Sequence, residues 1–214
     1  MKKGKFLKGA IFHVCNKSIA NYGIFKDPNN AKRFLETLDY YNGITTQSFS
    51  KSIKENKYSF QNLLHPKEDR KIKFICYCIM PDHYHLLVKM MENQTFSKYM
   101  NDIENSFTRY FNLKFSRKGP LWQSDFKAVR IRNNKQLLHV SRYIHLNPTT
   151  AYLVDKPEEW PFSSYKDFIH DKNILSSQMI EIEISNPFHY KQFVEDQIDY
   201  QRKLKFIKKM MLDS

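Results

Sequence analysis

Short apolar runs alternate along the chain with segments that repeat apolar residues at helical spacing. AIFHVCNKS is rich in β-branched and aromatic residues and predicts a strand, and the amphipathic run after it predicts a helix from about Asn29 to Tyr41. KIKFICYCIM, residues 71–80, and HYHLLVKM, residues 83–90, are apolar runs of strand length that flank Pro81 and Asp82. Because proline and aspartate favour turns, these runs predict a hairpin of two buried strands.

The second half of the chain continues this alternation. Apolar residues recur every three or four positions between 96 and 111 and predict a helix that ends at Gly119 and Pro120. LWQSDFKAVRIR, residues 121–132, predicts another strand, and NNKQLLHVSRYIHLNP predicts a helix that an asparagine caps and Pro148 ends. Residues 43–70 are polar, which indicates an insertion or a long connection, and helical runs are expected around 187–211.

The predicted order is therefore strand, helix, strand, strand, helix, strand, helix. Helices interleaved with hairpin-linked strands favour an α+β fold, in which helices pack on a ferredoxin-like antiparallel sheet. The 214 residues suffice for one substantial domain, predicted over 1–170, and a C-terminal helical extension over 171–214.

The charge of the chain indicates the kind of partner. It carries 35 Lys and Arg residues against 22 Asp and Glu residues, and the net charge of +13 favours a polyanion, with nucleic acid as the leading candidate. Three cysteines are an odd and small set, which argues against a secreted disulfide framework and favours a reducing compartment. The N-terminal segment is basic, but Lys8 interrupts its apolar residues, so the long apolar region and cleavage site of a secretion signal are not expected. No run approaches the roughly 18 apolar residues of a membrane span. We therefore expect a cytoplasmic protein that does not enter a membrane.

His83 and His85 are the first candidates for chemistry. Residues two apart in a strand share a face, so both imidazoles point together, as metal coordination requires, while Tyr84 points to the other face. Two other interpretations stay open. The pair can lie on a solvated sheet face, or it can hold structural zinc with Cys76 and Cys78 if the hairpin register sets Cys78 opposite His83. Those four ligands would lie nearly in a plane, whereas structural zinc is tetrahedral.

RYIHLNP supplies the second candidate. On a helix, Tyr143 and Asn147 are four residues apart and occupy one face, so a nucleophilic phenol could lie beside an amide oxygen that binds metal. Equally, Tyr143 can be a half-buried aromatic residue and Asn147 a helix C-terminal residue before proline. His139, one turn earlier, is conceivable as a general base but fits a supporting or surface position better, and His145 is interpreted as structural.

Four segments together resemble a known family. In their order and spacing, CIMPDHYHLLVK, GPLWQSDFKAVRI, SRYIHLNPTTAYLV and EEWPFSSY are similar to the REP-associated and insertion-sequence transposases with one catalytic tyrosine, which are HUH endonucleases. The resemblance extends from about Phe6 to Phe168. It implies a ferredoxin-like sheet with the two histidines on a central strand and the tyrosine on a neighbouring helix.

The resemblance also implies a role for each candidate residue. His83 and His85 correspond to the metal-binding pair, Tyr143 to the nucleophile, and Asn147 to a third ligand that is often glutamine in the family, although asparagine is one methylene shorter. The implied metal is Mg²⁺ or Mn²⁺. The implied reaction is metal-dependent nicking of single-stranded DNA and strand transfer through a 5′-phosphotyrosine intermediate, as in DNA transposition.

A basic and aromatic segment suits the DNA that this reaction needs. Residues 109–135 hold eight Lys or Arg residues and a single acid, interleaved with aromatic residues that could stack on the bases of single-stranded or hairpin DNA. The other interpretation is a set of core aromatics beneath a solvated charged face. The basic run from 202 to 209 is either a DNA-binding tail or a solvated helix. The candidate DNA contacts are Arg109, Gln123, Lys127, Arg130 and Arg132, with Gln123 and Lys127 on one face of the predicted strand.

Three alternatives to a transposase stay open. They are a nicking enzyme for plasmid or phage replication, a domesticated regulator that binds DNA hairpins without strand transfer, and a zinc-stabilised RNA-binding module that uses Cys76 and Cys78. The YIHLNP and WPFSSY blocks favour the transposase. The sequence leaves open whether the protein is a monomer or a homodimer.

Overall fold

The computed structural model describes residues 6–43, 45, 47–60, 62–64, 69–178, 184 and 186–212. Within them the strands are β1 (Ile11–Lys17), β2 (Ile72–Ile79), β3 (His83–Met90) and β4 (Lys127–Ile131). The α-helices are α1 (Pro28–Asn42), α2 (Phe49–Lys54), α3 (Phe96–Lys114), α4 (Asn134–Thr150), α5 (Tyr165–His170), α6 (Lys172–Gln178), α7 (Pro187–Glu195) and α8 (Ile198–Leu212). The predicted order is confirmed up to α4, with α2 added inside the polar segment 43–70. Residues 44, 46, 61 and 65–68 of that segment lie outside the described residues.

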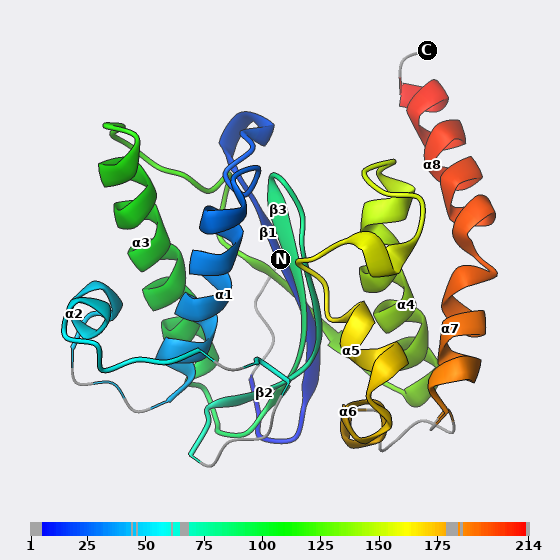
Figure 1. Cartoon of the computed structure of the whole chain (residues 1–214), viewed down its shortest axis with the longest axis horizontal. Coiled ribbons are helices and arrows are strands. Elements are labelled where there is room, and N and C mark those ends of the chain that lie inside the picture. Colours follow the sequence, from blue (N-terminus) through cyan, green and yellow to red (C-terminus); the bar gives the residue numbers. More distant parts are fainter. Residues whose placement is uncertain are drawn as a thin grey trace.

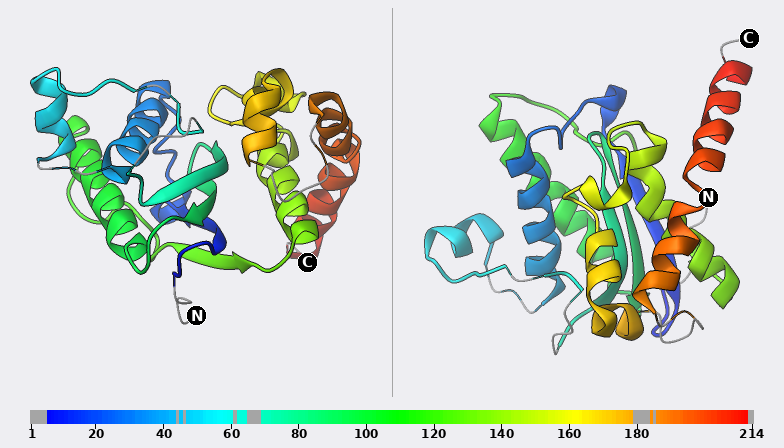
Figure 2. Two further views of the ribbon diagram at one scale, coloured as in Figure 1. Left: turned by 90° about the horizontal axis from the view of Figure 1, so that it is seen from below. Right: turned by 45° about the vertical axis from the view of Figure 1, so that its right-hand side comes forward.

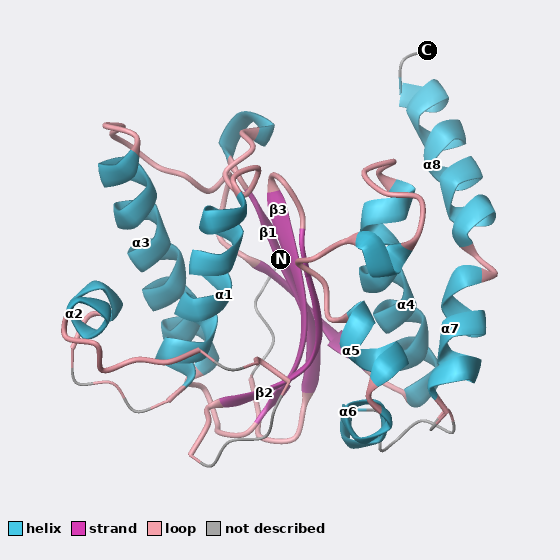
Figure 3. Cartoon of the chain, viewed as in Figure 1, coloured by secondary structure: helices cyan, strands magenta, loops and turns pink. Residues whose placement is uncertain are grey.

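The strands form one antiparallel sheet in the order β2-β3-β1-β4. The predicted hairpin of β2 and β3 is confirmed, and β3 lies inside the sheet, with a partner on each side. A β-α-β-β-α-β succession closed into this sheet is the predicted ferredoxin-like α+β fold. Figure 3 shows the sheet, in magenta, between two groups of helices.

Helices cover both faces of the sheet (Figure 1). α1 and α3 pack together on one face, while α4 lies over the other and is flanked by α7 and α8. Figure 2 shows the same two groups from below and after a turn of 45° about the vertical axis. Since side chains alternate along a strand, β1 sends Phe12 toward the α3 side, where its ring contacts Phe6, which in turn contacts Phe96 of α3. The next residue, His13, points toward Tyr143 of α4.

Tyr84, the middle residue of HYH, anchors β3 in the core beneath α1 and α3. Its ring lies 5.1 Å from the ring of Phe34 and 5.7 Å from that of Trp122. Its hydroxyl donates to Glu104 Oε1 at 2.6 Å, and the side-chain amide of Asn16 donates to the same oxygen at 2.8 Å. A slip of one residue would turn Tyr84 out of this core, so the anchor fixes the register that directs both histidines toward α4.

Two predicted boundaries before α4 are wrong. α3 ends at Lys114 rather than at Gly119, because Ser116 takes a left-handed conformation with φ of 48° and the Arg117 N–H turns back to the Asn112 carbonyl. β4 begins only at Lys127, because residues 121–126 bend to pack Leu121 and Phe126 into the core. Gln123 therefore lies in a loop and does not share a strand face with Lys127.

The predicted end of α4 is also wrong. The helix continues through Pro148 to Thr150, although proline removes one helical hydrogen bond. Leu146, Pro148 and Thr149 are all buried, so packing of this last turn outweighs the local preference to stop.

The C-terminal helices pack against α4. Both α7 and α8 contact it, and the predicted helical runs near 187–211 are confirmed. Arg202 on α8 donates to the carbonyl oxygens of Thr149 and Val154, so the first residue of the basic run is held by the fold. In the described part of the chain, every helix is too short or too polar to span a membrane.

Candidate functional site

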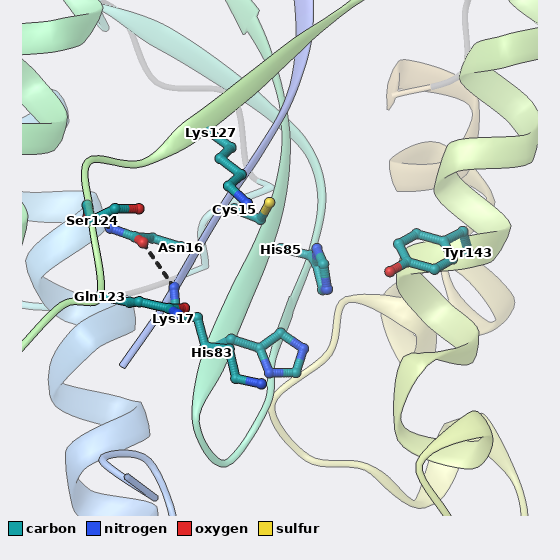
Figure 4. A pocket seen from close by; sticks show the side chains of 9 residues that line it. All are labelled: Cys15, Asn16, Lys17, His83, His85, Gln123, Ser124, Lys127 and Tyr143. Atoms are coloured by element: carbon teal, nitrogen blue, oxygen red, sulfur yellow. Dashed lines mark hydrogen bonds between the residues drawn. The ribbon is translucent and has the colours of Figure 1, made fainter. Parts of the chain in front are cut away.

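A pocket of about 250 Å³ opens where β1 and β3 face α4 (Figure 4). Segments far apart in the sequence supply its walls: two neighbouring strands, the loop before β4, and α4. The lining residues are Cys15, Asn16, Lys17, His83, His85, Gln123, Ser124, Lys127 and Tyr143. The fold thus brings together five of the residues that the sequence singles out, namely His83, His85, Gln123, Lys127 and Tyr143.

The two histidines of HYH are each held through one ring nitrogen. Asp82 Oδ1 lies 2.6 Å from His83 Nδ1, and His13 Nε2 lies 3.0 Å from His85 Nδ1. The rings of His83 and His85 meet edge to face, with centroids 5.0 Å apart. Because Nδ1 is engaged in both rings, Nε2 is the nitrogen that remains for a ligand, and such support is typical of histidines that bind metal.

Burial keeps these imidazoles neutral, which is the form that coordinates metal. Burial lowers the pKa of His85 well below its ordinary value, and neighbouring His13 and His83 add to that effect. Burial also lowers the pKa of His83, against the opposing effect of Asp82, and lowers the pKa of His13 to about 4.

Tyr143 reaches the pocket from α4, opposite the histidines. Its ring centroid lies 5.4 Å from that of His85 and 6.0 Å from that of His13. In Figure 4 the hydroxyl points toward the histidines. The side chain is 47% exposed, and partial burial raises the pKa of the phenol above its usual value of 10.0, with Asn147 opposing part of the rise. The tyrosine therefore carries its proton at neutral pH.

Asn147 lies one turn after Tyr143 but is not among the residues that line the pocket. Its side-chain amide donates to the backbone carbonyl of Tyr143 at 2.9 Å. This bond engages the amide nitrogen, whereas the oxygen Oδ1 is the atom that would bind a metal. Its role as a ligand stays a prediction.

The two histidines of α4, His139 and His145, lie outside the pocket lining. His139 is exposed, and its Nδ1 lies 2.9 Å from the guanidinium of Arg142. His145 is fully buried, with its ring nitrogens 2.9 Å from the Tyr190 hydroxyl and 2.9 Å from Ser164 Oγ. These environments suit a surface position for His139 and a structural role for His145.

The predicted DNA contacts separate into two groups. Gln123 and Lys127 line the pocket, and Lys17, which the sequence did not single out, adds a second cation there, with Nζ 3.3 Å from Asp82 Oδ2. Arg109 is exposed on α3, on the opposite face of the sheet. Arg130 and Arg132 line a separate hollow near the start of α4.

Sequence reasoning missed His13 as a member of the site and used Cys15 only to judge the redox compartment. The signal was present, because H-V-C on the first predicted strand has the same alternation as H-Y-H and places both side chains on one face. The missing information was the pairing of β1 with β3, which sets Cys15 opposite His85.

The zinc arrangement considered for Cys76 and Cys78 does not form. The register sets Cys78 opposite His85 and Cys76 opposite Leu87, so both cysteines share the face of the histidines, with a bulge between Phe74 and Cys76. Both cysteines are fully buried, and Cys78 Sγ lies 3.7 Å from Met80 Sδ. Among the described residues, the group with metal-binding geometry contains neither of them.

The chain is similar to known transposases. Residues 44–147 match the family model described as "Transposase IS200 like". The chain is 31% identical over 100 residues to a REP-associated tyrosine transposase of Escherichia coli, an alignment that covers 46% of this chain and 58% of that relative. The chain thus matches less than two thirds of the length of this curated relative.

A solved structure shares the fold. It is described as the structure of the REP-associated tyrosine transposase bound to a REP hairpin. The match covers 80% of this chain and 86% of the chain in that structure, with a TM-score of 0.56. At 19% sequence identity, this likeness establishes the common architecture.

Proposed function

As a relative of the REP-associated tyrosine transposases, this chain unites a tyrosine and two neutral histidines in one pocket, and we propose that it nicks and rejoins single-stranded DNA in a metal-dependent reaction. The observation that carries the proposal is the position of Tyr143. Its ring lies 5.4 Å from the ring of His85, and its hydroxyl is directed toward the histidines. A tyrosine placed there can attack a phosphate held beside the imidazoles.

In the proposed reaction, Tyr143 Oη attacks a DNA phosphorus in line with the leaving 3′ oxygen. A bond forms between the tyrosine oxygen and phosphorus while the bond from phosphorus to the 3′ oxygen breaks. The tyrosine proton passes to solvent, and the 3′ oxygen takes one up, which leaves a 5′-phosphotyrosine and a free 3′-hydroxyl. Attack by a 3′-hydroxyl on this linkage reverses the step and joins strands, without any nucleotide cofactor.

His83, His85 and Asn147 are the proposed ligands of a divalent cation, Mg²⁺ or Mn²⁺. The imidazoles fit this role because both are neutral and because Asp82 and His13 hold their Nδ1 atoms. When bound, the cation supplies positive charge that stabilises the phosphate oxygens during attack.

The charges of the pocket support hairpin or single-stranded DNA as the substrate. Lys17 and Lys127 line the pocket and can neutralise phosphates on either side of the cleaved bond, while Gln123 offers a hydrogen bond. The solved protein with this fold was bound to a REP hairpin, which favours hairpins over unstructured strands. Arg109, Arg130 and Arg132 lie outside the pocket lining and would contact DNA away from the reacting phosphate.

The test is formation of a covalent adduct with labelled hairpin oligonucleotides from the DNA that flanks the protein's own gene. A denaturing gel should show an adduct with Mn²⁺ or Mg²⁺ and none with chelator. Tyr143→Phe should abolish the adduct, because only the attacking oxygen is removed, and His83→Ala should abolish it through the metal. Tyr152→Phe is the matched control, since Tyr152 is 62% exposed and lies outside the pocket lining.

A different result would support the alternative function, a regulator that binds DNA hairpins without strand transfer. If the wild-type protein binds these hairpins but forms no adduct with either metal, DNA binding without strand transfer replaces the proposed enzyme. An adduct that persists in Tyr143→Phe would assign the nucleophile to another residue.

A further inference from the structure

A second set of metal-binding side chains adjoins the proposed catalytic pair. His13 and Cys15 lie two residues apart on β1 and point to the same face of the sheet, and strand pairing sets Cys15 directly opposite His85 on β3. The ligand atoms of these three side chains lie within 4.8 Å of one another. His85 is buried, and the other two are partly buried beside the pocket.

We propose that His13, Cys15 and His85 bind a thiophilic divalent cation, with Zn²⁺ as the natural candidate. Two imidazoles and one thiolate are donors that zinc prefers, whereas Mg²⁺ prefers oxygen. Three protein ligands leave a fourth position open toward the pocket, where water or a phosphate oxygen can complete a tetrahedron.

The distances fit such an ion with small side-chain rotations. Tetrahedral zinc, with bonds of about 2.0 Å to nitrogen and about 2.3 Å to sulfur, needs roughly 3.4 Å between two nitrogens and roughly 3.6 Å between nitrogen and sulfur. His13 Nε2 and His85 Nδ1 are already 3.0 Å apart, and the sulfur lies within the 4.8 Å of the group. The ion would take the place of the proton that these two imidazoles now share.

Cys15 must lose its proton to bind zinc as a thiolate. Burial raises the pKa of the Cys15 thiol, whereas the charge of Lys127, its partner on β4, lowers it. The proton on Cys15 is thus held in the absence of metal and released when a cation binds, as is usual for cysteine ligands. The arrangement differs from the proposed catalytic one because His85 would bind through Nδ1, toward His13, rather than through Nε2.

Two kinds of ion would therefore compete for one residue. When His85 binds zinc together with His13 and Cys15, it is no longer available to the catalytic cation that it would bind together with His83. Zinc should therefore inhibit DNA nicking. This consequence, unlike the site itself, rests on the proposed function.

Cobalt(II) alone is the probe for the site, because thiolate ligands give it an intense near-ultraviolet charge-transfer band that nitrogen and oxygen ligands do not. We expect the wild-type 214-residue chain to develop this band with one equivalent of Co²⁺ and to lose it when Zn²⁺ is added. Cys15→Ser should abolish the band, and His13→Ala should weaken binding at least tenfold. His83→Ala is the control that should keep the band, since His83 belongs only to the proposed catalytic set.

Circular dichroism of each variant distinguishes loss of the site from loss of the fold. The proposal is overturned if the folded wild-type protein shows no thiolate band at a tenfold excess of Co²⁺, or if the band survives in Cys15→Ser. In that case the contact of His13 with His85 only holds the His85 imidazole in place.

The inhibition is tested separately with the adduct assay. With Mn²⁺ in excess, added Zn²⁺ should reduce adduct formation by the wild type far more than by Cys15→Ser. Equal inhibition of both proteins would overturn the proposal that zinc at this site inhibits DNA nicking. A complete absence of adduct would be a failure of the proposed function, and the cobalt spectra would remain a valid test of the site.

Discussion

Asp82→Asn tests how the protein prepares His83 for metal. The carboxylate of Asp82 lies 2.6 Å from His83 Nδ1 and 3.3 Å from Lys17 Nζ, so it both orients the ring and raises the electron density of the imidazole. Asparagine preserves the shape, and its amide oxygen can still accept from Nδ1–H. The substitution therefore removes the charge while leaving a hydrogen bond in place.

The expected magnitude follows from this geometry. Loss of a group that supports a metal-bound histidine typically costs about 10- to 100-fold in metal affinity, which corresponds to roughly 1.4–2.7 kcal/mol. Because the asparagine oxygen still holds the ring, we expect the lower limit of about tenfold. The ion pair with Lys17 is partly solvated, so its loss should change the free energy of unfolding by less than about 1 kcal/mol.

The assay is the rate of adduct formation as a function of Mn²⁺ concentration. The Mn²⁺ concentration for half-maximal rate should rise about tenfold in Asp82→Asn, while the rate at saturating Mn²⁺ falls much less. Asp155→Asn is the matched control, because its side chain is 96% exposed and lies outside the pocket lining. An unchanged half-maximal Mn²⁺ concentration together with a reduced maximal rate would refute support of metal binding by Asp82.

Two further substitutions test the structural and DNA-binding roles of other residues. His145→Ala should lower the free energy of unfolding, measured by urea denaturation, by about 3 kcal/mol, because it removes two buried hydrogen bonds of about 1 kcal/mol each and leaves a cavity. A loss below about 1 kcal/mol would contradict a structural role for His145. Lys127→Ala should weaken hairpin binding and reduce the slope of log affinity against log salt by about 1, whereas Lys98→Ala, on α3, should leave the slope unchanged.

Most helices and strands were predictable because their signals are local. The spacing of residues in HYHLLVKM and between 96 and 111 follows from which side chains must be buried. Both elements form, although α3 ends before the predicted Gly119. Two of the wrong boundaries lie where distant packing outweighs local preference. Pro148 stays helical because its turn is buried, and Gln123 leaves the strand because Leu121 and Phe126 enter the core.

The sequence by itself determined the HYH pair, the tyrosine on its own helix, the basic charge and the element order. These depend only on residue type and on spacing within one segment, or on the resemblance that the four blocks carry. Only the tertiary structure showed that His13 and Cys15 of β1 join His85. His13 and His85 are 72 residues apart, and their contact depends on the pairing of β1 with β3. That pairing is set by cooperative burial of both strands, which no single segment encodes.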